Sequence, residues 1–361
     1  MRNVAIINAS QDKDGIYLDI LDTYRALIES GFTVERYQCF DPGHNQHFFL
    51  DGTSIRGIYL PSLNIEMGVN RLIVFPRRIP NLSGRTVLLS DPTLLNISER
   101  VEEAWVKIHD LRPLTKYADK FWTKLMFRHM LPKISTVRKI IVSSQHMKEE
   151  IEGAGIDEER IVVLPEAIPP SYSNVDGIAH IERSILKITE GRGIDLLYVA
   201  QDRPYKNISI FLNIAKYFSD NNTGTRMRFH LVSPIKEKTK QLINSLNLQN
   251  LTVYSNLNDL NSIYENSDLL LFPSLYEGFG RPVIEAMSYG IPVIAHNIQP
   301  IIEITDGASK LVGVNDLQSW KESILSLLNP ESYRDYGLRS WKRSKYFSWD
   351  LFKERVKTVF A

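Results

Sequence analysis

The amino-acid sequence predicts an α/β protein made of two domains. A chain of 361 residues is too long for one ordinary hydrophobic core. Residues 4–7 (VAII), a helix pattern at 17–30 that ends at Gly31, and residues 32–34 (FTV) indicate a βαβ opening. Residues 268–272 (DLLLF) form a short apolar run before a glycine-rich turn and a helix pattern, which is typical of a parallel sheet.

Composition and charge narrow the class of protein. Hydrophobic residues make up 43% and charged residues 24%, as in soluble globular proteins. The 43 Lys and Arg residues against 42 Asp and Glu give a net charge of +1, which offers no case for nucleic-acid binding. The single cysteine, Cys39, excludes a disulfide within the chain and fits a reducing compartment. Because neither a signal peptide nor a bilayer-spanning segment is visible, we expect a cytoplasmic protein, able to lie at the inner face of the cell membrane.

The junction at residues 273–287 (PSLYEGFGRPVIEAM) carries the strongest functional pattern. Pro282 suits the first helical position, because its missing N–H costs nothing there. Two glycines in the loop let an anion approach the amides at the helix N-terminus, at the carboxyl ends of parallel strands, where ligands bind. Glu277 and Glu285 are poor phosphate ligands but good acceptors for sugar hydroxyls. The pattern therefore predicts a nucleotide-sugar site. In the alternative interpretation, Glu285 is a surface residue of the helix and Glu277 is a loop carboxylate that only complements the helix dipole.

The spacing from Glu277 to Glu285 resembles the E-x7-E motif of retaining GT-B glycosyltransferases, in particular the large family four. Residues 286–295 (AMSYGIPVIA) also resemble that family's pattern. The resemblance implies two Rossmann-like domains that face each other across a cleft, with a C-terminal helix that crosses back to the N-terminal domain. It implies that Glu277 lies near the donor sugar and phosphates as a catalytic residue and that Glu285 binds the ribose. The loop residues that it implies in donor binding are Gly278, Phe279, Gly280 and Arg281.

The predicted strand at residues 194–200 leads to Lys206-Asn207, which resembles the KN pair of the same family. The resemblance makes Lys206 a ligand of the donor diphosphate. Gln201 replaces the arginine that is common in this segment, and Arg203 is the residue that we expect to supply the missing charge. A lysine at a helix start is unfavourable against the helix dipole unless an anion is present, which favours this role over that of a solvated surface residue.

The first half of the chain resembles the family more weakly. His109 ends a predicted strand in a His-Asp-Leu segment similar to the family's HDL, and the resemblance places it as a catalytic residue in the cleft, although a lone histidine is usually structural. Gly15 stands where the family carries a glycine loop against the donor. Glu166-Ala167 replaces the usual Asn-Gly, so no role is assigned there.

The triplet Asp12-Lys13-Asp14 spells D-x-D, the metal motif of the other glycosyltransferase fold. Its position after the first strand does not suit that fold. We therefore expect no essential metal and no cofactor apart from the nucleotide-sugar substrate.

The expected domain boundaries follow from these segments. Residues 1–168 form an N-terminal acceptor-binding Rossmann-like domain, and the proline-containing segment 169–193 connects it to the next domain. Residues 194–340 form a Rossmann-like domain that binds the nucleotide sugar. Residues 341–361 form a C-terminal helix that packs back on the first domain.

The segment 116–139 contains basic residues at every fourth position, namely Lys116, Lys120, Lys124 and Arg128, beside aromatic residues. Such a stripe fits an interfacial helix on anionic lipid or an acceptor that carries a lipid diphosphate. It fits equally an ordinary domain helix whose lysines are solvated.

The resulting hypothesis is a retaining glycosyltransferase that moves a mannose- or rhamnose-like hexose to a glycan or lipid-linked glycan. The alternative is a non-catalytic protein of the same fold that binds a nucleotide sugar or acts as a scaffold. A dinucleotide-dependent oxidoreductase would need G-x-G-x-x-G, and Gly278-Phe279-Gly280 is followed by Val283. An epimerase or phosphorylase is a further alternative within the fold, and the latter needs a cofactor lysine site that the sequence does not reveal.

Overall fold

The computed structural model describes residues 3–10, 15–40, 55–59, 75–118, 121–172, 175–221, 224–255, 260–313 and 316–361. The chain divides into two compact units. Unit 1 contains Met1–Ala167 together with Asp350–Ala361, and unit 2 contains Ile168–Trp349. Among the described residues, no helix is both long and apolar enough to cross a bilayer.

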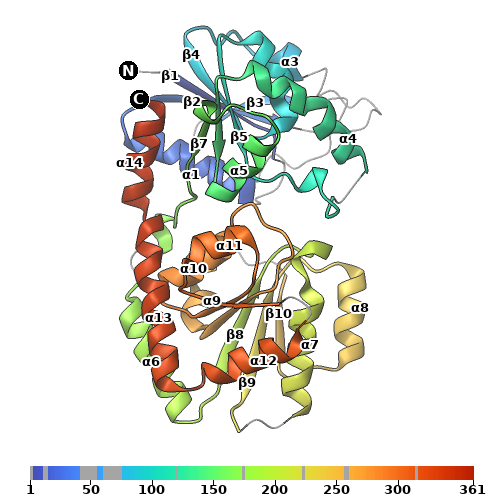
Figure 1. Ribbon diagram of the computed structural model, residues 1–361, viewed down its shortest axis with the longest axis vertical. Helices are drawn as coiled ribbons and strands as arrows, with labels where there is room; N and C mark the ends of the chain where they lie inside the picture. Colours follow the sequence, from blue (N-terminus) through green and yellow to red (C-terminus); the bar gives the residue numbers. More distant parts are fainter. Residues whose placement is uncertain are drawn as a thin grey trace. The chain divides into compact units, whose positions relative to one another are not determined.

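Unit 1 is built on a parallel sheet with the strand order β3-β2-β1-β4-β5-β6-β7 (Figure 1). Its strands are β1 (Asn3–Asn8), β2 (Thr33–Phe40), β3 (Ile55–Tyr59), β4 (Arg85–Leu89), β5 (Glu103–Ile108), β6 (Lys139–Val142) and β7 (Ile161–Val163). Its α-helices include α1 (Gly15–Glu29), α3 (Phe75–Arg78), α4 (Phe121–Met130), α5 (Gln145–Gly153) and α14 (Trp349–Phe360). The βαβ opening predicted from the sequence is confirmed by β1, α1 and β2, which pair in parallel.

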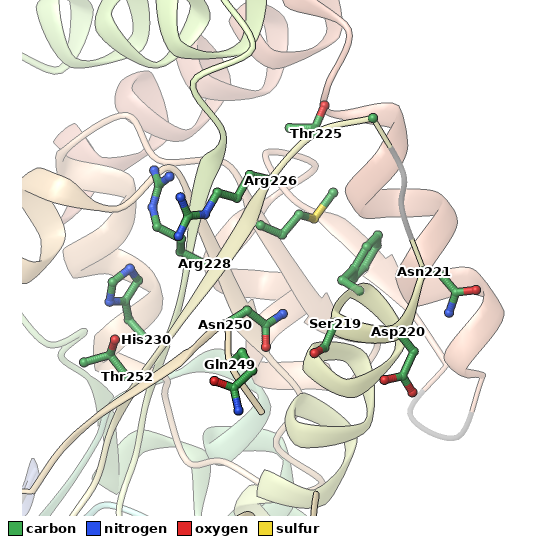
Figure 2. Close-up of a pocket in the computed structure, with 13 residues that line it drawn as sticks. Ser219, Asp220, Asn221, Thr225, Arg226, Arg228, His230, Gln249, Asn250 and Thr252 are labelled. Carbon is green, nitrogen blue, oxygen red and sulfur yellow. The ribbon is translucent and has the colours of Figure 1, made fainter. Parts of the chain in front are cut away.

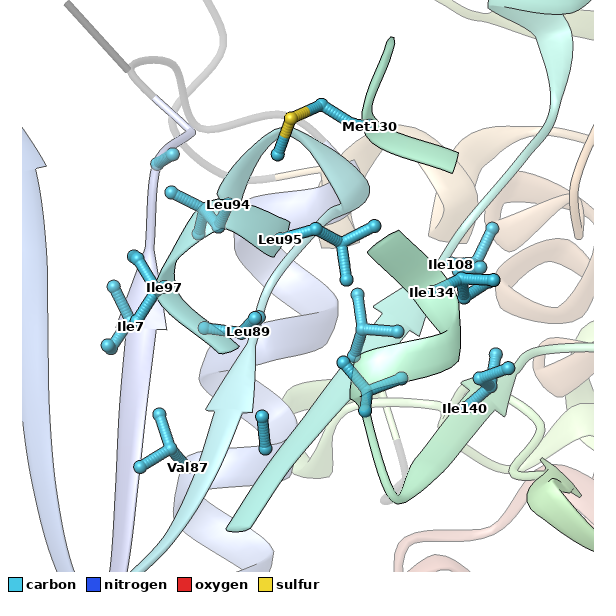
Figure 3. Packing of buried hydrophobic residues seen from close by; sticks show 14 of the residues in the cluster. Ile7, Val87, Leu89, Leu94, Leu95, Ile97, Ile108, Met130, Ile134 and Ile140 are labelled. Carbon is cyan, nitrogen blue, oxygen red and sulfur yellow. The ribbon is translucent and has the colours of Figure 1, made fainter. Parts of the chain in front are cut away.

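The core of unit 1 lies between this sheet and two short helical segments, η3 (Pro92–Arg100) and η5 (Leu131–Thr136). Figure 3 shows Ile7, Leu89 and Ile108 from the sheet among Leu95 and Ile134 from these segments. Each buried aliphatic side chain of this kind contributes about 1.5–3 kcal/mol relative to an exposed one. The continuous apolar runs of the strands are explained by this burial.

Unit 2 is a second parallel sheet, with the order β10-β9-β8-β11-β12-β13. Its strands are β8 (Ile194–Val199), β9 (Met227–Val232), β10 (Leu251–Tyr254), β11 (Leu269–Phe272), β12 (Val293–His296) and β13 (Lys310–Val312). Its α-helices include α6 (Gly177–Thr189), α7 (Ile208–Asp220), α8 (Glu237–Leu246), α9 (Asn261–Asn266), α10 (Arg281–Ser288), α11 (Gln299–Thr305), α12 (Leu317–Ser326) and α13 (Pro330–Ser344). Two Rossmann-like parallel sheets are thus present, as predicted.

The end of the chain returns to unit 1. Helix α13 packs on α6 in unit 2, whereas α14 belongs almost entirely to unit 1 (Figure 1). The ring of Phe360 lies 4.7 Å from the ring of Trp105 on β5, and Lys139 Nζ donates to the carbonyl of Val359 at 3.1 Å. Of the C-terminal helix expected at 341–361, residues 350–361 thus return to the first unit, whereas residues 341–349 belong to unit 2.

One segment differs from the sequence-based expectations. The expected connection 169–193 contains helix α6, whose Ile181 and Ile185 are buried in the core of unit 2. These isoleucines stand four residues apart on one helical face, a pattern that predicts a packed helix.

Candidate functional site

Two loops meet at the carboxyl edge of the sheet of unit 2. Residues 200–207 follow β8 and residues 273–280 follow the adjacent strand β11. The backbone N–H of Leu275 donates to the carbonyl of Tyr205 at 2.7 Å, which ties the loops together. The strand order reverses direction between β8 and β11, and ligands of open parallel sheets bind at such switch points.

Helix α10 begins directly after the second loop, at Gly280. The φ angle of Gly280 is +127°, and a Cβ there would lie 2.7 Å from Ile301 Cδ1, so this position requires glycine. Pro282 has no N–H, and the N–H of Val283 donates to the carbonyl of Gly280 at 2.9 Å. An anion at this helix start would therefore meet the backbone of the predicted loop, residues 278–281, rather than later amides of the helix.

An ion pair joins the two loops. Lys206 Nζ lies 2.6 Å and 2.8 Å from the two carboxylate oxygens of Glu277, and the side chains are 16% and 9% exposed. Asn207, in the left-handed region at φ 52°, follows Lys206, whose carbonyl accepts from the hydroxyl of Tyr198 at 3.0 Å. The backbone conformation thus directs the nearly buried side chain of Lys206 toward the glycine loop.

Glu285 is the fifth residue of α10. It is buried; its Oε1 accepts from Arg281 Nε at 3.0 Å and its Oε2 accepts from the hydroxyl of Tyr264 at 2.9 Å. Arg281, which the sequence assigned to donor binding, therefore orients Glu285. Tyr264, on α9, was not identified from the sequence, because nothing local connects it with Glu285.

Two other predicted donor residues have different surroundings. The side chain of Phe279 is buried against Phe347, with ring centroids 5.8 Å apart, so only its backbone remains for the predicted role. Arg203 lies in the β8 loop, and its Nε lies 3.4 Å from Gln201 Oε1. Arg203 is thus in the same loop as Lys206, and its role in phosphate binding stays a prediction.

His109 lies at the end of β5 in unit 1. Its Nε2 lies 3.1 Å from the carbonyl of Ser90, and its Nδ1 lies 3.4 Å from Asp19 Oδ2. Burial lowers the pKa of His109 below its ordinary value, against the opposite influence of the Asp19 carboxylate. Because a carbonyl only accepts, Nε2 carries the hydrogen in this contact.

A buried ion pair lies behind His109. Lys107 Nζ is 2.8 Å from Asp19 Oδ1 and 2.6 Å from Oδ2, and both side chains are buried. Neither residue was identified from the sequence, although a lysine inside the apolar strand EAWVKI is a sign of a buried partner. Asp19 is 88 residues away, on the buried face of α1.

One group of the described residues could hold a metal ion. Asp19, His109 and Glu166 each offer one ligand atom, and these atoms lie within 4.8 Å of one another. Lys107 already neutralises Asp19, and a second cation beside it would be repelled. The expectation of no essential metal stays a prediction.

Gly15 is the first residue of α1. A Cβ at this position would meet no atom within 4 Å, so the packing of the described part of unit 1 does not itself require glycine there. The predicted contact of Gly15 with the donor stays a prediction.

A cavity of about 670 Å³ lies at the amino ends of the strands of unit 2 (Figure 2). Two of its basic side chains contact Asp195: Arg228 Nε donates to Asp195 Oδ1 at 2.6 Å, and His230 Nε2 lies 2.9 Å from the same oxygen. The predicted donor residues are not among those that line it. The candidate site is therefore the opposite, carboxyl edge of this sheet.

Comparison with known proteins shows what the chain is similar to. A family model described as glycosyl transferases group 1 matches residues 182–339. The chain is 27% identical over 232 residues to the O-antigen chain mannosyltransferase RfbU of Salmonella typhimurium, covering 62% of this chain and 60% of that protein. It is 26% identical over 269 residues to the O-antigen chain mannosyltransferase B of Escherichia coli, covering 70% of this chain and 69% of that one. The match therefore spans less than two thirds of the first relative.

Solved structures share the fold over the whole chain. A sucrose-phosphate synthase from Thermosynechococcus elongatus aligns with a TM-score of 0.76 at 17% identity, covering 100% of this chain and 98% of that one. HepE of Anabaena, solved in complex with UDP and glucose, aligns with a TM-score of 0.77 at 13% identity, covering 100% and 99%. These likenesses confirm the GT-B fold class.

Proposed function

Since residues 182–339 belong to the glycosyl transferases group 1 family, we propose that this protein is a retaining glycosyltransferase. It transfers a hexose from a nucleotide-diphosphate sugar to a glycan or a lipid-linked glycan. The names of the two mannosyltransferase relatives support mannose over rhamnose as the transferred sugar. The non-catalytic alternative predicts nucleotide-sugar binding without turnover.

The Lys206–Glu277 pair is the observation that carries the proposal. It places one cation and one hydroxyl acceptor side by side at the glycine loop, with the buried carboxylate of Glu285 one helical turn beyond the start of α10. A nucleotide-diphosphate sugar offers a diphosphate between two sets of hydroxyls, which is the complementary arrangement of groups. Lys206 binds the diphosphate in this proposal, Glu277 the transferred sugar and Glu285 the ribose.

In this proposal the acceptor hydroxyl attacks the anomeric carbon of the donor sugar on the same face from which the diphosphate departs. The bond between the anomeric carbon and the diphosphate breaks, and the acceptor oxygen forms a bond to that carbon on the same face. The acceptor proton passes to the departing phosphate oxygen. Lys206 and the loop amides stabilise the charge that develops on the diphosphate. His109 is the second catalytic residue of this proposal.

A donor screen tests this proposal. Thermal unfolding of the purified protein is followed with GDP-, UDP-, dTDP- and ADP-sugars, and hydrolysis or transfer is measured in parallel. A ligand that binds only the folded state must raise the melting temperature. We expect one nucleotide to do so and the shift to disappear in Glu285→Ala. No shift with any of the four donors on folded protein would contradict the proposal, and a shift without turnover would favour the non-catalytic alternative.

We also propose that the acceptor is lipid-linked and that α4 contacts the membrane. Leu125 on α4 is 47% exposed, and its neighbours Arg128 and His129 are exposed as well. An exposed leucine among cations fits the interface of an anionic bilayer.

We expect the protein to sediment with phosphatidylglycerol vesicles and the double substitution Lys124→Glu/Arg128→Glu to abolish this binding. The matched control, Lys238→Glu/Lys240→Glu on α8, makes the same charge change in unit 2; an equal loss there would count against a specific role of α4.

A further inference from the structure

The carboxylate of Glu285 is fixed on both oxygens by residues of unit 2. Arg281 Nε donates to Oε1 at 3.0 Å and the hydroxyl of Tyr264 donates to Oε2 at 2.9 Å. A carboxylate has about four lone-pair positions, so these two bonds do not exhaust its capacity. They do fix the plane of the group, and with it the directions in which further hydroxyl donors are accepted.

Tyr264 is itself rigidly held. Its side chain is completely buried, and its ring stacks on Tyr289 with centroids 5.6 Å and planes 22° apart. Tyr172 contacts the ring edge-on at 5.9 Å. Burial raises the pKa of Tyr264 well above its ordinary value, so the hydroxyl remains a donor at any physiological pH. Since it is fully buried, Tyr264 reaches a ligand only through Glu285.

We infer that Tyr264 is a positioning residue of the donor site, and that its hydroxyl holds the Glu285 carboxylate so that it accepts both ribose hydroxyls of the nucleotide. The inference rests on the proposed function, because Glu285 is the ribose ligand of that proposal. Recognition of the ribose diol belongs to the proposed function. Tyr264 takes part in it without touching the substrate.

The expected effect follows from the removal of one hydroxyl. Tyr264→Phe keeps the stacked ring and deletes the bond to a charged acceptor, so that Oε2 of Glu285 loses this donor while Arg281 still holds Oε1. A hydrogen bond to a charged group corresponds to about a ten- to hundredfold change in an equilibrium constant. The nucleoside diphosphate should therefore bind about ten- to hundredfold more weakly. The Michaelis constant for the donor should rise more than the turnover number falls.

The test compares two ligands on the full chain by calorimetry: the nucleoside diphosphate that stabilises the wild type, and its 2′,3′-dideoxy analogue. Tyr264→Phe should weaken binding of the diphosphate and leave binding of the analogue as in the wild type, because the lost orientation matters only to the diol. Tyr289→Phe removes a hydroxyl from the same ring cluster, one that donates to Asn261 at 3.0 Å, and should change neither affinity. Equal losses for both ligands, or no loss, would overturn the inference.

A second variant keeps the test independent of the folding of Tyr264→Phe. Glu285→Gln alters the same contact from the other side, and its loss should also be confined to the ligand with the diol. A loss shared by both ligands would again overturn the inference. A wild-type protein that binds no nucleoside diphosphate would overturn the proposed function and this inference together, whereas binding without diol dependence would overturn the inference alone.

Discussion

Glu277→Gln is expected to lower turnover by about 100- to 1,000-fold, the range found when one electrostatic contact to a reacting group is removed. The substitution keeps the size of the side chain and removes its charge. Lys206 Nζ then loses the carboxylate that it contacts at 2.6 Å and 2.8 Å. Because the lysine no longer shares its charge with Glu277, the nucleoside diphosphate should bind at least as tightly as to the wild type.

The measurement is transfer with the identified donor, together with calorimetry of the nucleoside diphosphate. The informative result is a fall in turnover without a fall in affinity for the nucleoside diphosphate, since a merely misfolded site would lose both. Lys206→Met is the matched variant on the other side of the pair and should weaken diphosphate binding. Near-normal turnover of Glu277→Gln would remove the catalytic role assigned to Glu277.

The largest effect on stability is expected from Lys107→Met in unit 1. Lys107 and Asp19 are paired at 2.6 Å with side chains 0% and 1% exposed. Removing the cation leaves a buried carboxylate without its counterion, and breaking such a pair costs about 3–5 kcal/mol. The change in the free energy of unfolding of unit 1 is measured by urea denaturation, with hydrogen exchange of the β5 amides as the probe of unit 1.

A double variant separates the contribution of the ion pair to stability from that of side-chain packing. Lys107→Met with Asp19→Leu replaces both charges by apolar groups and should recover most of the lost stability, since an apolar pair is often no worse than a buried ion pair. Lys148→Met is the surface control, because its partner Glu158 is 71% exposed and such pairs contribute about 0–1 kcal/mol. A loss in Lys107→Met no greater than in this control would show that the buried pair is not a determinant of stability.

The sequence predicted the strand, loop and helix at the carboxyl edge of unit 2 well, because their pattern is local. The apolar run of β11, the glycine loop and Pro282 at the helix start lie within twenty residues, and the structure shows them as strand, loop and α10. The proximity of Lys206 to Glu277, 71 residues later, was implied only by resemblance to a family. Neither residue carries a local sign of the other.

Contacts between distant residues account for what was missed. Tyr264 and Glu285 belong to different helices, and Asp19 and Lys107 come from a helix and a strand 88 residues apart. Hydrophobic periodicity shows which face of an element is buried, but not which polar groups meet there. Phe279 illustrates the same limit within a motif: its neighbours suggested a ligand contact, whereas its ring packs into the core.

The division of the chain has a consequence for the order of synthesis. Unit 1 is discontinuous: residues 168–349 of unit 2 are inserted between its two pieces. A ribosome therefore delivers every residue of unit 2 before it delivers the helix whose Phe360 covers Trp105. Until then the nascent first piece keeps this apolar surface open, which is the kind of surface that chaperones bind. Unit 2 can therefore complete its folding before unit 1, although the synthesis of unit 1 begins first.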